Sequence, residues 1–303
     1  MFKTFPEFSR LTIADRDEYE SYIESYPPVS DISFALLMTW WNTTDNMAVA
    51  LLNGNLVLSY WIPGDEKHSG LSLIGTRRVD ESLCILFDYL RDKGDPVKLV
   101  NVPSFVLNRV QYPELFSFKE DRRYDEYVVP VVNYYPLENI TVPKRIRIRR
   151  RLRALEPSEV IVKELDLTDS EDKKLLISLG DAWRHKNINN YGTHERDAMK
   201  IAIDEARQLG VHCISLFVDG ELYGFCLFEY MLDEQYVTVI YVKATHQSSL
   251  GYELMLYKFA EWFSAKGVTY VNLGADMGLM RLRMFMLTIG PTNFFRKYAI
   301  YPA

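Results

Sequence analysis

Two stretches of the chain repeat one order of apolar and polar segments. The first contains NMAVALLNGNLVLSYW, GLSLIG, ESLCILFDYLRDKG and VKLVNV, and the second contains VHCISLFVDGELYGFCLFEY, QYVTVIYVKA, GYELMLYKFAEWFSAKG and VTYVNL. Short or alternating apolar runs favour strands, whereas apolar residues spaced about 3.6 apart favour a helix. Each stretch therefore predicts three strands, a helix and a fourth strand.

Matching turn residues support the repeat. Asparagine-glycine and aspartate-glycine pairs accept the positive φ values of tight hairpins, and a glycine after a helix suits its left-handed cap. A near-constant spacing between equivalent landmarks predicts two copies of one fold; chance similarity is the alternative. The landmarks are Asn53-Gly54 with Asp219-Gly220, Gly94 with Gly267, and Asn101 with Asn272.

Two helical segments precede each stretch. In the first half they are DRDEYESYIESY and SDISFALLMTWW, where Ser30 or Asp31 is expected to be the N-cap. In the second half they are DSEDKKLLISLGDAWRHK and THERDAMKIAIDEARQLG. The resulting β-α-α-β-β-β-α-β order resembles a GNAT-type acyltransferase domain. The fold class expected is therefore α/β (α+β), with two tandem GNAT-like domains, each a mixed, mostly antiparallel sheet flanked by helices.

The segment between the halves is strongly basic. Seven of the ten residues 144–153 are lysine or arginine. Ile148, Leu152 and Leu155 have helical spacing, so we expect a helix over residues 143–155 that docks through one apolar stripe. The domains expected are a degenerate GNAT-like unit at 1–135, a basic connecting helix at 136–158, and a second GNAT-like unit at 159–303 that carries the site.

Composition narrows the class of protein. The chain has 303 residues, 48% of them hydrophobic, and 35 basic against 41 acidic residues, for a net charge of −6. These values exclude a disordered chain or a coiled coil, and a basic function must be local. Without a signal peptide or an apolar run long enough to span a membrane, the expected location is cytoplasmic. The three cysteines, Cys84, Cys213 and Cys226, predict buried residues rather than disulfides or a zinc site.

Several kinds of active site lack their motifs. No phosphate-binding loop, dinucleotide-binding glycine motif, zinc-protease motif, EF-hand or nucleophile elbow occurs in the sequence. The five histidines form no metal-ligand pattern. We therefore expect no metal and no required cofactor.

One strand-to-helix turn is a candidate for binding the donor. In GNAT enzymes, the strand equivalent to QYVTVIYVKA offers backbone groups to the pantetheine arm of coenzyme A, and the following helix N-terminus binds its pyrophosphate. This resemblance implies donor contacts at Val242, Lys243, Gln247 and Gly251. The usual glycine-rich loop is only partly matched, so an ordinary turn is the alternative.

The whole chain resembles the family related to the C-terminal domain of phosphatidylglycerol lysyltransferase. Matching pieces include SDISFALLMTWWN, YDEYVVPVVNYYPL, PKRIRIRRRLRAL, AWRHKNIN and THERDAMKIAI, then LFVDGELYGFCLFEY and VNLGADMGLMRLRMFMLTIGPTNFFRKYAIYP. The resemblance implies transfer of an acyl or aminoacyl group. In the best-known branch, charged tRNA is the donor and a membrane lipid is the acceptor.

Family positions transfer to this sequence one at a time. The matched residues are Asp276, Gly278, Arg283, Lys243 and Glu195. The sequence departs from the family at other polar positions, which here are Gly274, Met280-Arg281, Met286 and Val242. These losses imply a changed substrate or lost activity.

The candidate residues have competing interpretations. Asp276 is a general base or amine anchor, or else a helix cap. Tyr241 is a general acid or a packing residue, and Arg283 clamps an anionic substrate or makes an ordinary ion pair. Lys243 steadies a phosphate or an oxyanion, or is a solvated strand end. Glu195 and Trp183 border the acceptor site, although Trp183 also suits a core.

The basic segment has three interpretations. It binds tRNA phosphates, it binds anionic lipid head groups, or it is an ordinary solvated face. In the first two cases, the residues expected to make the contacts are Arg147, Arg150 and Arg151.

Three functions remain open. The first is an acyl- or aminoacyltransferase that uses a CoA thioester or charged tRNA as donor and an amine or hydroxyl as acceptor. The second is a non-catalytic binding or regulatory protein on the same scaffold, and the third is a cell-envelope acyltransferase of the CelD/FemAB-like type. The sequence does not determine the oligomeric state.

Overall fold

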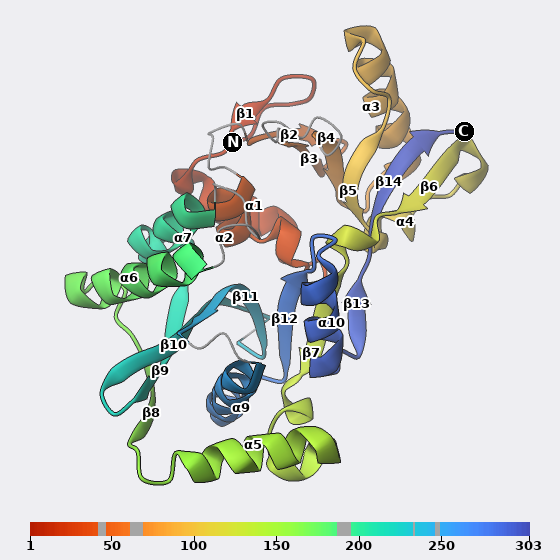
Figure 1. Cartoon of the computed structure of the whole chain (residues 1–303). Coiled ribbons are helices and arrows are strands. Elements are labelled where there is room, and N and C mark those ends of the chain that lie inside the picture. The colour runs from red at the N-terminus through yellow and green to blue at the C-terminus, as the bar shows by residue number, and fades with distance from the viewer. Residues whose placement is uncertain (42–46, 61–68, 187–194, 233, 246–248) are drawn as a thin grey trace. The chain divides into compact units, whose positions relative to one another are not determined.

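The computed structural model describes residues 1–41, 47–60, 69–186, 195–232, 234–245 and 249–303 (Figure 1). The chain divides into two compact units, each built around one sheet. The first unit comprises Met1–Glu126, Ala275–Met280 and Phe294–Ala303, and the second comprises Tyr127–Gly274 and Arg281–Asn293.

The first sheet has the strand order β1-β2-β3-β4-β5-β14-β6. Its neighbouring strands are antiparallel except β4 and β5, which are parallel and pair only at Leu71 and Leu99. The Asn53-Gly54 hairpin joins β2 to β3 with φ values of 54° and 80°, as predicted. The strands are β1 (Ser9–Arg10), β2 (Ala48–Leu52), β3 (Asn55–Tyr60), β4 (Gly70–Ile74), β5 (Leu99–Pro103), β6 (Phe116–Glu120) and β14 (Lys297–Pro302).

Helix α3 buries an apolar face in the core of the first unit and ends at Gly94, which has a φ of 73° as the sequence predicted. The N-cap expected at Ser30 or Asp31 is wrong. Those two residues lie in a buried 3-10 turn, and the Ser33 side chain caps the next helix by accepting from the Leu36 N–H. The helices of this unit are α1 (Arg16–Ile23), α2 (Phe34–Leu36) with a π-helical turn (Leu37–Trp41), α3 (Val79–Lys93) and α4 (Ser104–Leu107).

The second sheet has the strand order β13-β7-β12-β11-β10-β9-β8. The Asp219-Gly220 hairpin joins β9 to β10 with φ values of 51° and 81°, again as predicted. The strands are β7 (Glu126–Pro130), β8 (Val160–Glu164), β9 (His212–Val218), β10 (Glu221–Met231), β11 (Tyr236–Ala244), β12 (Tyr270–Ala275) and β13 (Asn293–Phe295).

Helices cover both faces of the second sheet (Figure 1). Helix α9 packs on one face with an apolar core that includes Met255, Phe259 and Phe263, and α6 contacts β10 and β11. The helices are α5 (Val142–Ala154), α6 (Ser170–Lys186), α7 (Glu195–Asp204), α8 (Ala206–Leu209), α9 (Ser249–Ala265) and α10 (Met280–Ile289).

The two sheets share one plan and exchange one strand each. In each sheet, four neighbouring antiparallel strands are followed in sheet order by a strand parallel to the fourth, β5 or β12. The next strand in each sheet, β14 or β7, comes from the other half of the sequence. Strand β7 closes the first half of the sequence but lies in the second sheet, and β14 closes the second half but lies between β5 and β6 of the first. The expected boundaries assign all of 159–303 to one domain, whereas β14 pairs within the first sheet.

Other local expectations have mixed outcomes. The basic segment forms α5 as predicted, and Ile148, on the buried side of this helix, is 1% exposed. Cys213 and Cys226 are buried, but Cys84 is exposed on α3, contrary to the expectation. None of the helices in the described ranges combines the length and the apolarity needed to cross a membrane.

Candidate functional site

Strand β11 presents Tyr241 and Lys243 on one face of the second sheet. Side chains two residues apart point to the same side of a strand. Lys243 lies opposite Phe225 of β10, and Tyr241 lies opposite Leu227. A bulge at this point, where Leu227 pairs with Tyr241 and Phe228 with Val239, leaves Ile240 as an extra residue in β11. The bulge therefore sets which residues after Ile240 face α6 and α7.

Lys243 forms a buried ion pair. Its Nζ lies 2.5 Å from Oε1 of Glu195, the first residue of α7, and the two side chains are 7% and 8% exposed. The same Nζ lies 3.6 Å from the ring centroid of Trp183 on α6. Burial lowers the pKa of Lys243, and the Glu195 carboxylate opposes that shift. The structure thus brings together Lys243, Glu195 and Trp183.

Tyr241 lies at the edge of this cluster. It is 3% exposed, and its ring centroid is 6.0 Å from the Lys243 Nζ. Burial and the charge of Glu195 raise its pKa well above the ordinary value. A tyrosine in this state remains protonated at neutral pH and can act as a proton donor, although the raised pKa makes it a weaker acid than a free tyrosine.

Trp183 connects the cluster to a cavity of about 200 Å³. The indole Nε1 donates to the Tyr252 hydroxyl at 3.2 Å, which fixes the plane of the ring. The cavity lies between α6 and the ends of β10 and β11, where Leu179, Leu222 and Thr245 also line it. A small substrate group in this cavity would lie against the tryptophan that covers the buried lysine.

Strands β11 and β12 separate toward the end of β11. They pair in parallel from Tyr236 with Tyr270 to Thr238 with Asn272, and β11 then continues to Ala244 paired with β10. Apolar side chains, Val242 among them, line the space beyond and leave a cavity of about 50 Å³. Gly251 is buried in the first turn of α9, and Gln247 lies outside the described residues.

Asp276 closes a turn ahead of α10. It is fully buried, and its Oδ1 accepts from the Gly278 N–H at 2.7 Å while its carbonyl accepts from Leu279 N–H. The helix itself begins at Met280, so Asp276 shapes the approach to α10. Arg283 lies within α10 and is half-buried.

The arginines of α5 differ in their surroundings. Arg147 binds Glu253 of α9 through Nε and Nη2, at 3.0 and 2.5 Å, so its charge is already paired. Arg150 is exposed. Arg151 is half-buried, and its charge opposes the burial-driven rise in the pKa of Tyr223.

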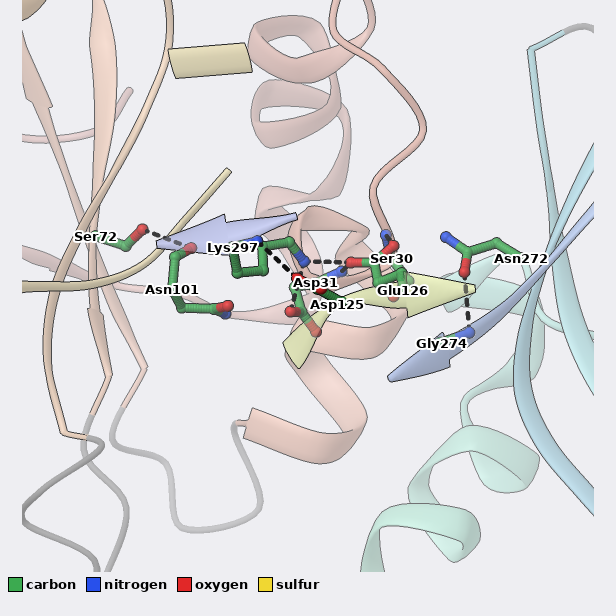
Figure 2. Close-up of polar contacts among 9 residues, drawn as sticks. All are labelled: Ser30, Asp31, Ser72, Asn101, Asp125, Glu126, Asn272, Gly274 and Lys297. Atoms are coloured by element: carbon green, nitrogen blue, oxygen red, sulfur yellow. Dashed lines mark hydrogen bonds and ion pairs between the residues drawn. The ribbon is translucent and has the colours of Figure 1, made fainter. Parts of the chain in front are cut away.

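The first unit contains a buried polar cluster that the sequence analysis missed. Lys297 of β14 is fully buried, its Nζ lies 2.7 Å from Asp31 Oδ2, and it also pairs with Glu126 (Figure 2). Burial acts to lower the pKa of Lys297, but the two carboxylates outweigh it and raise that pKa. The Glu126 carboxylate also accepts from the backbone N–H groups of Ser30 and Asp31 at 2.7 and 3.2 Å. The one hint in the sequence was the Lys297-Tyr298 pair, near the end of the C-terminal segment that resembles the family.

Comparison with known families identifies the chain. A family model described as phosphatidylglycerol lysyltransferase, C-terminal, matches residues 25–281. The chain belongs to this family. The family match ends at the start of α10, so β13 and β14 lie beyond it. No curated protein matches the sequence.

Solved structures show the same fold as this phosphatidylglycerol lysyltransferase C-terminal family member. A conserved protein of unknown function from Bacteroides thetaiotaomicron has a TM-score of 0.82 at 22% identity, over 98% of this chain and 99% of the other. L-PGS from Bacillus licheniformis has a TM-score of 0.60 at 15% identity, over 95% and 92%. FemX has a TM-score of 0.58 at 13% identity, over 98% and 97%. These likenesses confirm the GNAT-like fold expected from the sequence.

Proposed function

We propose that this protein is an aminoacyltransferase whose reacting centre is the Lys243–Glu195 cluster of the second unit. Membership of the phosphatidylglycerol lysyltransferase C-terminal family supports transfer of an aminoacyl group. The observation that carries the proposal is the buried ion pair beside Tyr241 and Trp183. A structural ion pair would not need an aromatic cover and a cavity beside it.

In the proposed reaction, an amine or hydroxyl acceptor attacks the carbonyl carbon of an aminoacyl ester. The charge that develops on the carbonyl oxygen is stabilised by Lys243, whose charged form Glu195 favours against burial. The ester C–O bond then breaks, and Tyr241 donates its proton to the departing ribose oxygen. The proton that the acceptor loses passes to the Tyr241 oxygen, which restores the tyrosine at the end of the cycle.

Charged tRNA is the preferred donor. The apolar cavity lined by residues of β11, β12 and α9 has a volume of about 50 Å³, which offers little room for the pantetheine arm of a CoA thioester and so favours the tRNA donor. The exposed arginines of α5 offer a surface for RNA phosphates. The acceptor is proposed only as an amine or hydroxyl, with a lipid as the first candidate because of the family name.

The test is transfer of a radiolabelled amino acid from charged tRNA to lipid vesicles or to soluble amines. Tyr241→Phe should reduce kcat by roughly 10²- to 10⁴-fold, because it removes only the proton donor. Tyr257→Phe is the matched control: it lies on α9, is 6% exposed, and should leave transfer unchanged. The double variant Lys243→Met, Glu195→Gln should be inactive but folded, since no buried charge is left unpaired.

Three results would count against the proposal. Full transfer activity in the double variant would exclude the cluster as the reacting centre. Thermal stabilisation by acetyl-CoA or a longer acyl-CoA, with none by charged tRNA, would exclude the tRNA donor. If neither donor class bound, the alternative of a non-catalytic binding protein would replace the enzyme.

A further inference from the structure

A second cavity lies entirely within the first unit. It has a volume of about 320 Å³ and is bounded by residues of β3, β5, β6 and β14 together with Trp41 and Tyr124. Its size suits a nucleoside phosphate or a molecule of similar bulk. The proposed transfer chemistry assigns nothing to this unit.

Asn101 faces this cavity from an irregular point in β5. Its φ is 54°, in the left-handed region, which asparagine tolerates better than most residues. Strand β14 pairs Tyr298 with Val102 and Ile300 with Leu99, so Val100 and Asn101 together lie opposite Ala299. This bulge turns the side chain out of the ladder, and Ser72 donates to the Asn101 carbonyl at 3.3 Å (Figure 2).

The amide of Asn101 is poorly satisfied. Asn101 is 9% exposed, and among the described residues neither its Nδ2 nor its Oδ1 has a hydrogen bond of good geometry. The hydroxyl of Tyr60, 4% exposed, also lacks a bond of good geometry, and its weak interaction with the Asn101 side chain only partly opposes the burial-driven rise in the pKa of the tyrosine. A buried polar group left unsatisfied is costly, so a ligand that supplies the partners would gain affinity here.

The charges differ between the buried floor of the cavity, formed by Tyr60 and Asn101, and its solvent-exposed mouth. The floor is neutral, but Asp31 behind Tyr60 is close enough for its charge to add to burial in raising the pKa of that tyrosine. An anionic group at the floor would meet this carboxylate. Lys98 and the exposed Lys119 line the outer part. Of the other charged residues there, Glu120 lies 3.6 Å from Arg296, and Arg123 is occupied by Asp121. An anionic group is therefore favoured only at the mouth.

Aromatic rings form one wall. The Trp41 ring lies 5.3 Å from Tyr60 and 6.5 Å from Tyr124, centroid to centroid, at inclined angles. Trp41 is half-buried and lines the cavity, so part of its indole is accessible to a planar group. Stacking on such a ring suits an aromatic heterocycle.

We propose that this cavity binds a nucleotide. The base stacks on Trp41, its edge pairs with the Asn101 amide, and its phosphate lies by Lys119. An amide offers a donor beside an acceptor, which matches the donor–acceptor edge of adenine, cytosine or uracil. A neutral base at the floor also avoids the repulsion from Asp31 that a phosphate would meet. The nucleotide is either free or the terminal residue of a single-stranded RNA.

Calorimetric titration of the full chain with AMP, CMP, UMP and ribose 5-phosphate tests the proposal, and quenching of tryptophan fluorescence is a second readout. We expect the best of the three nucleotides to bind at least roughly tenfold more tightly than ribose 5-phosphate, which has no base to stack on Trp41 or pair with the Asn101 amide. Asn101→Gly keeps the left-handed backbone and should weaken binding roughly tenfold or more. Lys119→Ala should weaken it less and flatten its salt dependence, while Lys93→Ala on α3 should change neither.

Further measurements distinguish a free nucleotide from an RNA end and define the results that would overturn the proposal. A short RNA ending in adenosine that binds more tightly than AMP assigns the site to an RNA end, and equal affinity assigns it to free nucleotide. Absence of binding by all three nucleotides would overturn the proposal. So would inorganic phosphate binding as tightly as AMP, or Asn101→Gly binding normally with an unchanged melting temperature.

Discussion

At the scale of single residues, Lys297 controls the polar core of the first unit. Lys297→Met would leave Asp31 and Glu126 buried without a cation, so we expect a loss of about 3–5 kcal/mol in the free energy of unfolding. Urea denaturation measures it.

A compensated variant checks this prediction. Adding Asp31→Asn and Glu126→Gln to Lys297→Met removes all three charges, and the triple variant should recover part of the lost stability. If the triple variant were less stable than Lys297→Met alone, unpaired charge would not be the cause. Hydrogen bonds from Glu126 to Ser30 and Asp31 would then dominate.

Asp125 gives the same region a pH dependence. Burial raises its pKa from 3.8 to about 6, against an opposing hydrogen bond from the Lys297 N–H. The folded state therefore holds this proton more tightly than the unfolded state, and the contribution to stability is lost as pH rises from about 4 to 6. Asp125→Asn should stabilise the protein by about 1–2 kcal/mol above pH 6.

Thermal melting across a pH series would check that sign. The melting temperatures of Asp125→Asn and the unaltered chain should converge below about pH 4, where the aspartate is protonated in both states. A gap of constant size at all pH values would mean that the asparagine acts through its shape rather than its charge.

Site residues could be predicted from the sequence only where they match a pattern shared with the family. Family resemblance singled out Glu195, Lys243 and Trp183, and the structure brings these three together. Lys297 and Asn101 escaped because their environments depend on β14, which pairs with strands about 200 residues earlier. A lysine in KYAIY is indistinguishable in sequence from a solvated strand end.

At the scale of elements, α5 was predicted well because its signals are local. Its charge run and its apolar stripe lie within thirteen residues. Which arginines are available was not predictable, since the partner of Arg147 is Glu253 on α9. The structure thus separates a structural arginine from exposed Arg149, Arg150 and Arg153.

This separation yields a prediction for RNA binding. The triple variant Arg149→Ala, Arg150→Ala, Arg153→Ala should keep its fold, weaken tRNA binding, and reduce the slope of log affinity against log salt by about 2. Arg147→Ala should instead lower stability with little change in that slope. Filter binding at several salt concentrations measures both, and equal slopes in all variants would remove α5 from the RNA surface.

At the scale of the whole molecule, the strand exchange decides which fragments can fold. Strand β14 lies between β5 and β6, so a fragment of residues 1–135 lacks the strand that joins β6 to the rest of the sheet. It also lacks Lys297, the cation that pairs with Asp31 and Glu126. Periodicity could not predict this, because it identifies strands without saying which sheet each strand joins.

The fragment 1–135 should therefore remain largely unfolded. Residues 1–127 joined to 295–303 by a short glycine-serine linker should fold, because the Lys297 N–H lies 3.3 Å from the Asp125 carboxylate and β14 runs antiparallel to β6. A Lys297→Met version of the linked fragment is the matched control and should melt at a lower temperature. Circular dichroism and amide NMR spectra distinguish these states, and a folded 1–135 fragment would show that β14 is dispensable to the first sheet.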